Sequence, residues 1–184
     1  MIITQTVYNG AFIHQRFAYE HLRKNVSPIG DVISFIAPMD VTTNLIDLED
    51  TLSNDYIWSD LAFNFCWELP GLCPFGAVSF QRLFVANVSS ILQRFLHAYQ
   101  QIVVDGDDIR VDGKKASVSI TYNKNGAAIG HLGINIIAGD KAPSFAYSTM
   151  ITDPDHQKAF IDQVEQCFYE TTKDIFIATT KVIG

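Results

Sequence analysis

The segment GDDIRVDGKKASVSITYNKNGAAIGHLGINI, residues 106–136, decides the fold of this chain. The pair Asp112-Gly113 stands between two runs in which apolar and polar residues alternate, and such a pair tolerates the positive φ angles of a type I′ turn. The pattern therefore predicts a hairpin of residues 109–111 and 114–122. A third strand, over residues 129–137, extends it into an antiparallel meander.

Side chains alternate between the two faces of a strand, so the spacing assigns each residue of the meander to a face. The polar residues expected on one side are Lys115, Ser117, Ser119, Thr121, His131 and Asn135. The residues expected on the core side are Ala116, Val118, Ile120, Leu132, Ile134 and Ile136. We expect the polar side to meet solvent or a ligand, and Gly133 to leave room there for a ligand or another backbone.

Two simpler interpretations of this polar side stay open. An antiparallel sheet often has one wet face, on which lysine, serine and threonine are ordinary residues. A single histidine such as His131 is also more often structural than catalytic. The grouping of Lys115 with His131 and Asn135 favours a site, with Lys115 and His131 as catalytic candidates and Ser117, Ser119, Gly133 and Asn135 as binding candidates.

Length and composition limit the kind of protein. A chain of 184 residues with 48% hydrophobic and 18% charged residues fits a single domain over residues 1–184. A net charge of −7 argues against a nucleic-acid partner. The start of the chain lacks the features of a signal peptide, and no apolar run is long enough to suggest a membrane span. Three cysteines without metal-type spacing favour the cytoplasm.

The rest of the chain predicts strands and helices around the meander. We expect a strand over residues 2–7, a helix over 11–24, a strand over 32–37 that ends at Pro38, and a helix over 79–102. Asp153-Pro154 supplies an N-cap and a first-turn proline for a closing helix. The order predicts an α+β fold with a mostly antiparallel sheet flanked by helices.

Several polar residues outside the meander are further site candidates. Gln81 and Arg82 near a helix start could bind a phosphate or carboxylate, although an ordinary salt bridge explains the arginine equally. Glu68 ends an aromatic run, where a partly buried carboxylate indicates either a site or a structural pair, for instance with Arg82. Asp47 and Asp50 belong to an acidic stretch that could hold Mg²⁺, or could be solvated loop residues.

The motifs together resemble a known family. They are IDLED at 46–50, SDLAFNFCWE at 59–68, QRLF at 81–84, GDDIRVDGKKASVSI at 106–120 and HLGIN at 131–135. In order and spacing they resemble the family called domain of unknown function 366, over most of the chain. The resemblance implies the class II synthetase-like fold of the biotin and lipoate protein ligases.

Those ligases have a signature similar to D-I-x-V-x-G-x-K, whose lysine contacts an acyl-adenylate. By this resemblance Lys115 matches that lysine, and GIN at 133–135 is similar to a glycine-asparagine strand of biotin ligases. The chain departs from the pattern at Val118, where the ligases have glycine, and it lacks their glycine-rich nucleotide loops. The resemblance therefore implies the fold and the place of a site, without biotin or lipoate as substrate.

Three hypotheses follow. In the first, the protein binds a nucleotide or acyl-type small molecule and activates or transfers a carboxylate-containing group, with ATP and Mg²⁺ as possible cofactors. In the second, it is a non-catalytic ligand-binding or assembly protein that has lost ligase chemistry. A third hypothesis is acyl transfer through the thiol of Cys73. A homodimer is possible in each case.

Overall fold

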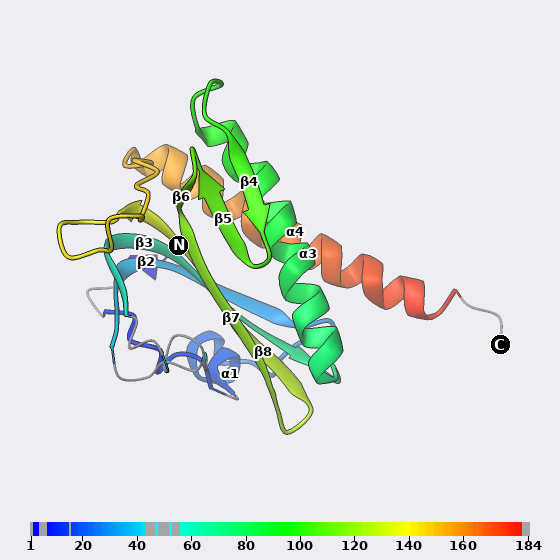
Figure 1. Ribbon diagram of the computed structural model, residues 1–184. Helices are drawn as coiled ribbons and strands as arrows, with labels where there is room; N and C mark the ends of the chain where they lie inside the picture. The colour runs from blue at the N-terminus through cyan, green and yellow to red at the C-terminus, as the bar shows by residue number, and fades with distance from the viewer. Residues whose placement is uncertain are drawn as a thin grey trace.

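The computed structural model describes residues 2–3, 7–14, 16–42, 47, 52 and 56–181. Its elements follow the chain in the order shown in Figure 1. They are β1 (Ile2–Ile3), α1 (Phe17–Leu22), β2 (Asp31–Val41), β3 (Ile57–Pro70), α3 (Pro74–Leu92), η1 (Gln93–Phe95), β4 (Ile102–Asp105), β5 (Asp108–Val111), β6 (Lys114–Lys115), β7 (Ser117–Lys124), β8 (Ala127–Ile137) and α4 (Pro154–Thr179).

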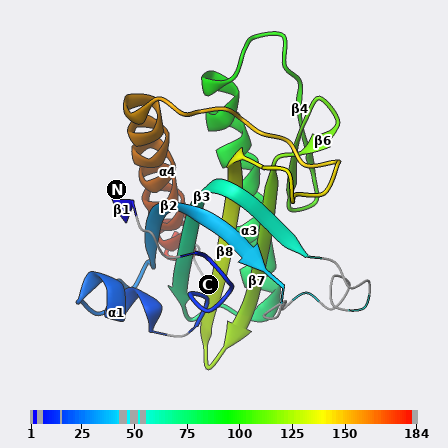
Figure 2. The ribbon, with the colours of Figure 1, turned by 90° about the vertical axis from the view of Figure 1, so that its left-hand side faces the viewer.

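A five-stranded sheet in the order β1-β2-β3-β8-β7 forms the centre of the molecule. Its long strands pair antiparallel, and only the short β1 pairs parallel, with β2. The helices α3 and α4 pack on one face, and α1 lies toward the other (Figures 1 and 2). The predicted α+β architecture, with a mostly antiparallel sheet flanked by helices, is confirmed.

Each face of the sheet has its own apolar core, which explains why β3 does not alternate cleanly in sequence. Phe63, Phe65 and Trp67 of β3 pack against α3 and α4. Ala62 and Cys66 of the same strand belong to the second core, with Phe17 of α1. A central strand buried on both faces reads as a nearly continuous apolar run.

The predicted hairpin turn is present. Asp112 and Gly113 have φ angles of 50° and 79°, and Val111 pairs with Lys114 across the turn. Two positive φ angles in a two-residue loop are the geometry of a type I′ turn. The predicted second strand is divided, because β6 belongs to a small sheet with β4 and β5, whereas β7 is the edge strand of the main sheet.

Several predicted boundaries were wrong. The strand β2 continues through Pro38 to Val41, because a register shift between Ala37 and Met39 places the proline at a bulge. The helix expected over 79–102 begins earlier, at Pro74, and is followed by η1, so that residue 102 opens β4. The first helix spans only Phe17–Leu22, and β1 spans Ile2–Ile3; residues 4–6 of the expected first strand lie outside the described residues.

Residues alternate within β7 and within β8 as expected, but the expectation that the polar residues of the two strands share one side was wrong. Residues directly opposite in an antiparallel pair share a face, and Ser117 pairs with Ile134 while Ile120 pairs with His131. Ser117, Ser119 and Thr121 therefore face the helix side of the sheet, with Ile134 and Leu132. Val118 and Ile120 share the other face with His131.

The hydroxyl groups can lie on the helix side because each one has a partner there. Ser117 Oγ accepts a hydrogen bond from the backbone N–H of Ile109 at 2.8 Å. Ser119 Oγ accepts from Gln81 Nε2 at 3.0 Å and donates to the carbonyl of His131 at 3.0 Å. Buried polar groups that are hydrogen-bonded cost little, so a serine face does not have to meet water.

Among the described residues, one helical segment, Pro74–Phe95, is long and apolar enough to cross a membrane. Half of its apolar window is buried inside the protein. Phe80, Phe84 and Val88 pack there against the sheet and α4, which accounts for the apolar composition of the helix.

Candidate functional site

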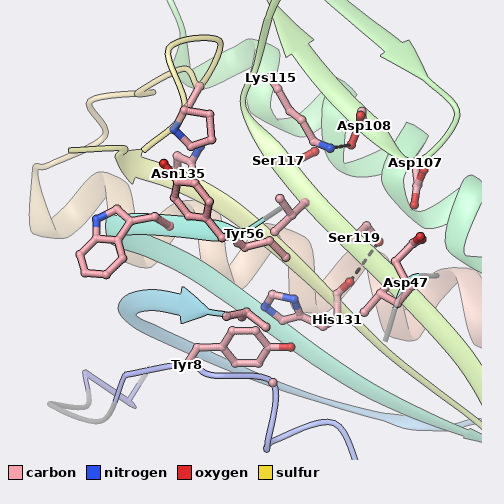
Figure 3. A pocket seen from close by; sticks show the side chains of 18 of the residues that line it. Tyr8, Asp47, Tyr56, Asp107, Asp108, Lys115, Ser117, Ser119, His131 and Asn135 are labelled. Atoms are coloured by element: carbon pink, nitrogen blue, oxygen red, sulfur yellow. Dashed lines mark hydrogen bonds and ion pairs between the residues drawn. The ribbon is translucent and has the colours of Figure 1, made fainter. Parts of the chain in front are cut away.

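A pocket of about 390 Å³ lies beside the edge strand β7 (Figure 3). This volume falls within the range of small-molecule sites in proteins. One wall comes from β7 and β8, a second from residues 8–13 and from β2 and β3, a third from the loop after β8, and a fourth from residues 107–108 and β6. The described residues that line it are Tyr8, Gly10, Ile13, Val41, Asp47, Tyr56, Ile57, Trp58, Asp107, Asp108, Lys115, Ser117, Val118, Ser119, Ile120, His131, Asn135, Pro143, Phe145 and Ala146.

Among the described lining residues, the cation is Lys115, at the end of β6. Its Nζ lies 2.9 Å from Asp108 Oδ1, and its side chain is 30% exposed (Figure 3). Its backbone makes two hydrogen bonds to the loop after β8, because its N–H donates to Phe145 O and its carbonyl accepts from Tyr147 N–H. This pairing fixes the strand that carries the ammonium group beside the loop that closes the pocket.

Asp107, next to this ion pair, connects the pocket to α3. Its carboxylate lies 2.9 Å from Arg82 Nη1 and accepts a hydrogen bond of 3.1 Å from Gln81 Nε2. The buried amide of Gln81 thus bridges Asp107 and Ser119. Gln81 and Arg82 are not among the lining residues. They orient and neutralise the carboxylate of Asp107, which does line the pocket.

The other end of the pocket is built around His131. Its Nε2 lies 2.9 Å from Asn64 Oδ1, and its ring stacks on Tyr8 with 3.9 Å between ring centroids. The ring is 2% exposed, and burial lowers the pKa of His131 to about 3. Burial likewise raises the pKa of the Tyr8 phenol. Both side chains are therefore uncharged at neutral pH.

The structure brings together five of the predicted binding and catalytic residues, namely Lys115, Ser117, Ser119, His131 and Asn135. Gly133 is not among the lining residues. A Cβ at this position would lie 2.6 Å from Met39 Sδ and 3.0 Å from His131 Cε1, so these two side chains occupy the space that we assigned to a ligand or backbone.

Other predicted residues lie elsewhere. Glu68 accepts hydrogen bonds from the backbone N–H of Arg16 at 3.3 and 3.2 Å, and Arg82 pairs with Asp107 instead. Cys73 caps α3, with its Sγ accepting from Gly76 N–H at 3.4 Å, and does not line the pocket.

The predicted metal pair is only partly described. Asp47 lines the pocket, and Asp50 lies outside the described residues. Within the part of the chain that the structure describes, no group of three or more histidine, cysteine, aspartate or glutamate side chains could hold a metal ion. The expectation of a magnesium site at Asp47 and Asp50 stays a prediction.

Sequence reasoning missed the acidic partners Asp107 and Asp108, the stacked Tyr8, the amide of Asn64 and the loop around Phe145. Asp107 and Asp108 stand in the segment 106–136 directly before the hairpin, so their sequence position was a usable signal. Tyr8 and Asn64 join the site through long-range pairing of strands, for which the local sequence gives no signal.

The sequence matches the model of one family, described as Domain of unknown function (DUF366), over residues 1–183. No curated protein matches the chain. Among solved structures, a protein of unknown function from Pyrococcus horikoshi has a TM-score of 0.86 at 22% identity, with 100% of this chain and 96% of that chain covered.

Two ligase structures are also similar. Lipoate-protein ligase A bound with ATP has a TM-score of 0.56 at 14% identity, covering 92% of this chain and 84% of that chain. Biotin protein ligase from Aquifex aeolicus in complex with biotin and ATP has a TM-score of 0.54 at 16% identity, covering 94% and 69%. At these identities the likeness shows the fold alone: the chain has a biotin/lipoate ligase-like fold.

Proposed function

The chain belongs to the domain of unknown function family DUF366, and from its ligase-like fold and its pocket we propose that it binds a small molecule with a single negative charge, which Lys115 contacts. The observation that supports this most is the position of the Lys115 ammonium group, partly exposed in the wall of a pocket whose other described lining residues are uncharged except for Asp47, Asp107 and Asp108. An ammonium group has three donors, so Lys115 can bind a ligand oxygen and keep Asp108.

The charges around Lys115 suit one anionic group. Asp107 pairs with Arg82, and Asp108 lies near both Lys115 and Arg110, at 2.9 and 3.8 Å. Arg110 lies closer to Asp105, at 3.4 Å, so the cations Arg82, Lys115 and Arg110 balance the carboxylates Asp105, Asp107 and Asp108. A ligand anion is therefore held by sharing the Lys115 ammonium group with Asp108, which suits a single charge. The roughly four negative charges of a nucleotide triphosphate have no matching cations among these residues, so ATP would need Mg²⁺, with Asp47 and Asp50 as the proposed ligands.

In the catalytic form of this proposal, the protein activates or transfers the carboxylate-containing group. Lys115 then stabilises the negative charge where the carboxylate and a nucleotide phosphate meet. The neutral His131, whose pKa burial lowers to about 3, favours a hydrogen-bonding role over proton transfer at neutral pH. ATP is bound by the similar ligases, and it enters here as the proposed second ligand.

A non-catalytic binding protein is the second candidate. It is favoured by the partners of Arg82 and Gln81, which hold Asp107 and do not line the pocket. A pocket that has no unpaired cation for a polyphosphate could still bind the acyl-type ligand, but it would not bind the nucleotide. Either form fits a cytoplasmic protein, for which the three free cysteines are the supporting observation.

Thermal unfolding with a ligand panel tests the proposal. The panel contains medium-chain carboxylates and ATP, each with and without Mg²⁺. A carboxylate at about a hundred times its dissociation constant should stabilise the protein by roughly 2.7 kcal/mol. Lys115→Ala should abolish this gain, whereas Lys114→Ala, which changes the exposed neighbour, should retain it.

The outcomes separate the two forms. A gain with Mg²⁺ and ATP, and release of AMP or pyrophosphate, supports catalysis. Stabilisation by carboxylates alone supports the binding protein. No stabilisation by any carboxylate, or the same gain in Lys115→Ala, would contradict the proposed role of Lys115.

A further inference from the structure

The tautomer of His131 follows from the hydrogen bonds of Asn64. Asn64 Nδ2 donates to the carbonyls of Ala62 at 3.1 Å and Ala37 at 3.4 Å, which places Oδ1 opposite the histidine. Because Oδ1 only accepts, the 2.9 Å contact requires the proton on His131 Nε2. A neutral imidazole has one ring proton, so Nδ1 holds a lone pair.

The direction of Nδ1 follows from the other ring atoms. Nε2 points toward Asn64 on the neighbouring strand β3. Cε1 lies beside Gly133, two residues further along β8, because a Cβ on this glycine would be 3.0 Å from it. Nδ1 and Nε2 flank Cε1 in the ring, so Nδ1 is on the side away from β3. On that side lies β7, where Val118 and Ile120 line the pocket.

The surroundings decide which ligand group suits this atom. Burial keeps the ring neutral by lowering its pKa to about 3, so Nδ1 cannot itself donate at neutral pH. Tyr8 stacks on the ring, Ile120 is its cross-strand neighbour, and Ile13 is a further apolar residue of the lining. A charged group here would lose its hydration without an opposite charge, whereas an uncharged donor loses much less.

We propose that His131 Nδ1 accepts a hydrogen bond from an uncharged N–H or O–H group on the apolar body of the ligand. This inference rests on the proposed function, in which Lys115 binds the anionic end of the same molecule. Lys115 lies five positions along the chain from Ile120, the partner of His131, and the two belong to β6 and β7; at the rise of a β-strand their backbones are at most about 16 Å apart. The ligand class is therefore an extended molecule with an anion at one end and a neutral hydrogen-bond donor far from it.

Two carboxylic acids of equal size, added as ligands to the full chain, test this inference. Nonanoate and 8-hydroxyoctanoate differ only in a terminal methyl group against a hydroxyl group. Calorimetric titration should show that the hydroxy acid binds about 2- to 10-fold more tightly, which is the net effect of one neutral hydrogen bond. His131→Phe keeps an aromatic ring on Tyr8 and removes Nδ1, so it should abolish this preference.

A spectroscopic measurement on the unmodified protein covers the case in which His131→Phe does not fold. In ¹⁵N NMR, Nδ1 of His131 should have the resonance of an unprotonated nitrogen, and 8-hydroxyoctanoate should move this resonance to lower frequency. Nonanoate should leave it in place. A purely structural histidine would respond to both acids alike.

The failures can be told apart. Equal affinity for both acids, or a preference that survives in His131→Phe, overturns the inference and leaves the Lys115 proposal intact. A hydroxyl preference that depends on His131 but not on Lys115 overturns the proposed function and leaves the inference. If neither acid binds, both are wrong.

Discussion

At position 131, burial decides the charge of the side chain, and this gives a dependence of stability on pH. The pKa of His131 is about 3 in the folded protein, against 6.5 for a free side chain. Between these values the unfolded state binds more protons. The free energy of unfolding should therefore be unaffected by this group above pH 6.5 and fall below it, by up to about 1.4 kcal/mol per pH unit.

Urea unfolding of the protein and of His131→Phe, from about pH 7 to about pH 4, measures this effect. Carboxylates contribute equally to both proteins, so their difference isolates the histidine. We expect the unmodified protein to lose more stability than the variant as the pH falls. Parallel curves would show that His131 is not buried in a neutral state.

The two serines of β7 show how polar side chains can lie on a buried face. Ser117 is fully buried, yet its hydroxyl accepts from Ile109 N–H, and Ser119 bonds to Gln81 and to a carbonyl of β8. Val118 and Ile120, which are apolar, share the face of His131 and line the pocket as well. Polarity by itself therefore does not assign a face when a buried partner is near.

At the scale of elements, the start of α4 depends on a local cap. Asp153 has extended backbone angles, and its carboxylate accepts from His156 N–H at 2.9 Å, with Pro154 in the first turn. Asp153→Ala should lower the free energy of unfolding by about 0.5–2 kcal/mol, because a helix N–H loses its partner.

Asp174→Ala is the matched control, since it removes an exposed aspartate far from the start of the same helix. We expect it to change stability by less than about 0.5 kcal/mol. Chemical denaturation of both variants gives the comparison. Equal effects would show that net charge, and not the cap, accounts for the loss.

At the scale of the whole molecule, α4 joins the helices to the main sheet. Phe160 is fully buried, and its ring lies against Phe63 at 4.8 Å, Phe95 at 5.3 Å and Phe65 at 6.1 Å, measured between centroids. Phe160→Ala should cost about 3–5 kcal/mol, through lost burial and the cavity that remains.

The same helix supplies a control phenylalanine. Phe176 lies near its C-terminal end, is half exposed and belongs to neither core cluster of the described residues. Phe176→Ala should cost no more than about 0.5 kcal/mol in thermal or urea unfolding. A large loss in this variant would mean that the end of α4 is covered by another surface, such as a second copy of the chain.

Much of the fold could be predicted because its signals are local. The turn at Asp112-Gly113 and the cap at Asp153 involve residues at most three positions apart, and both are present. Boundaries that depend on distant partners were wrong. Pro38 does not end β2, because a bulge accommodates it, and its carbonyl accepts from Tyr8 N–H.

The sequence by itself determined the type I′ hairpin, the N-cap at Asp153, the α+β class and the position of Lys115 beside that turn, since each depends on neighbouring residues. The tertiary structure alone decided which face each residue of β7 and β8 meets, and what lies there. Gln81 reaches Ser119 across 38 residues, and Asn64 reaches His131 across 67. Such pairs fix polar side chains because buried donors and acceptors must find partners, wherever the chain supplies them.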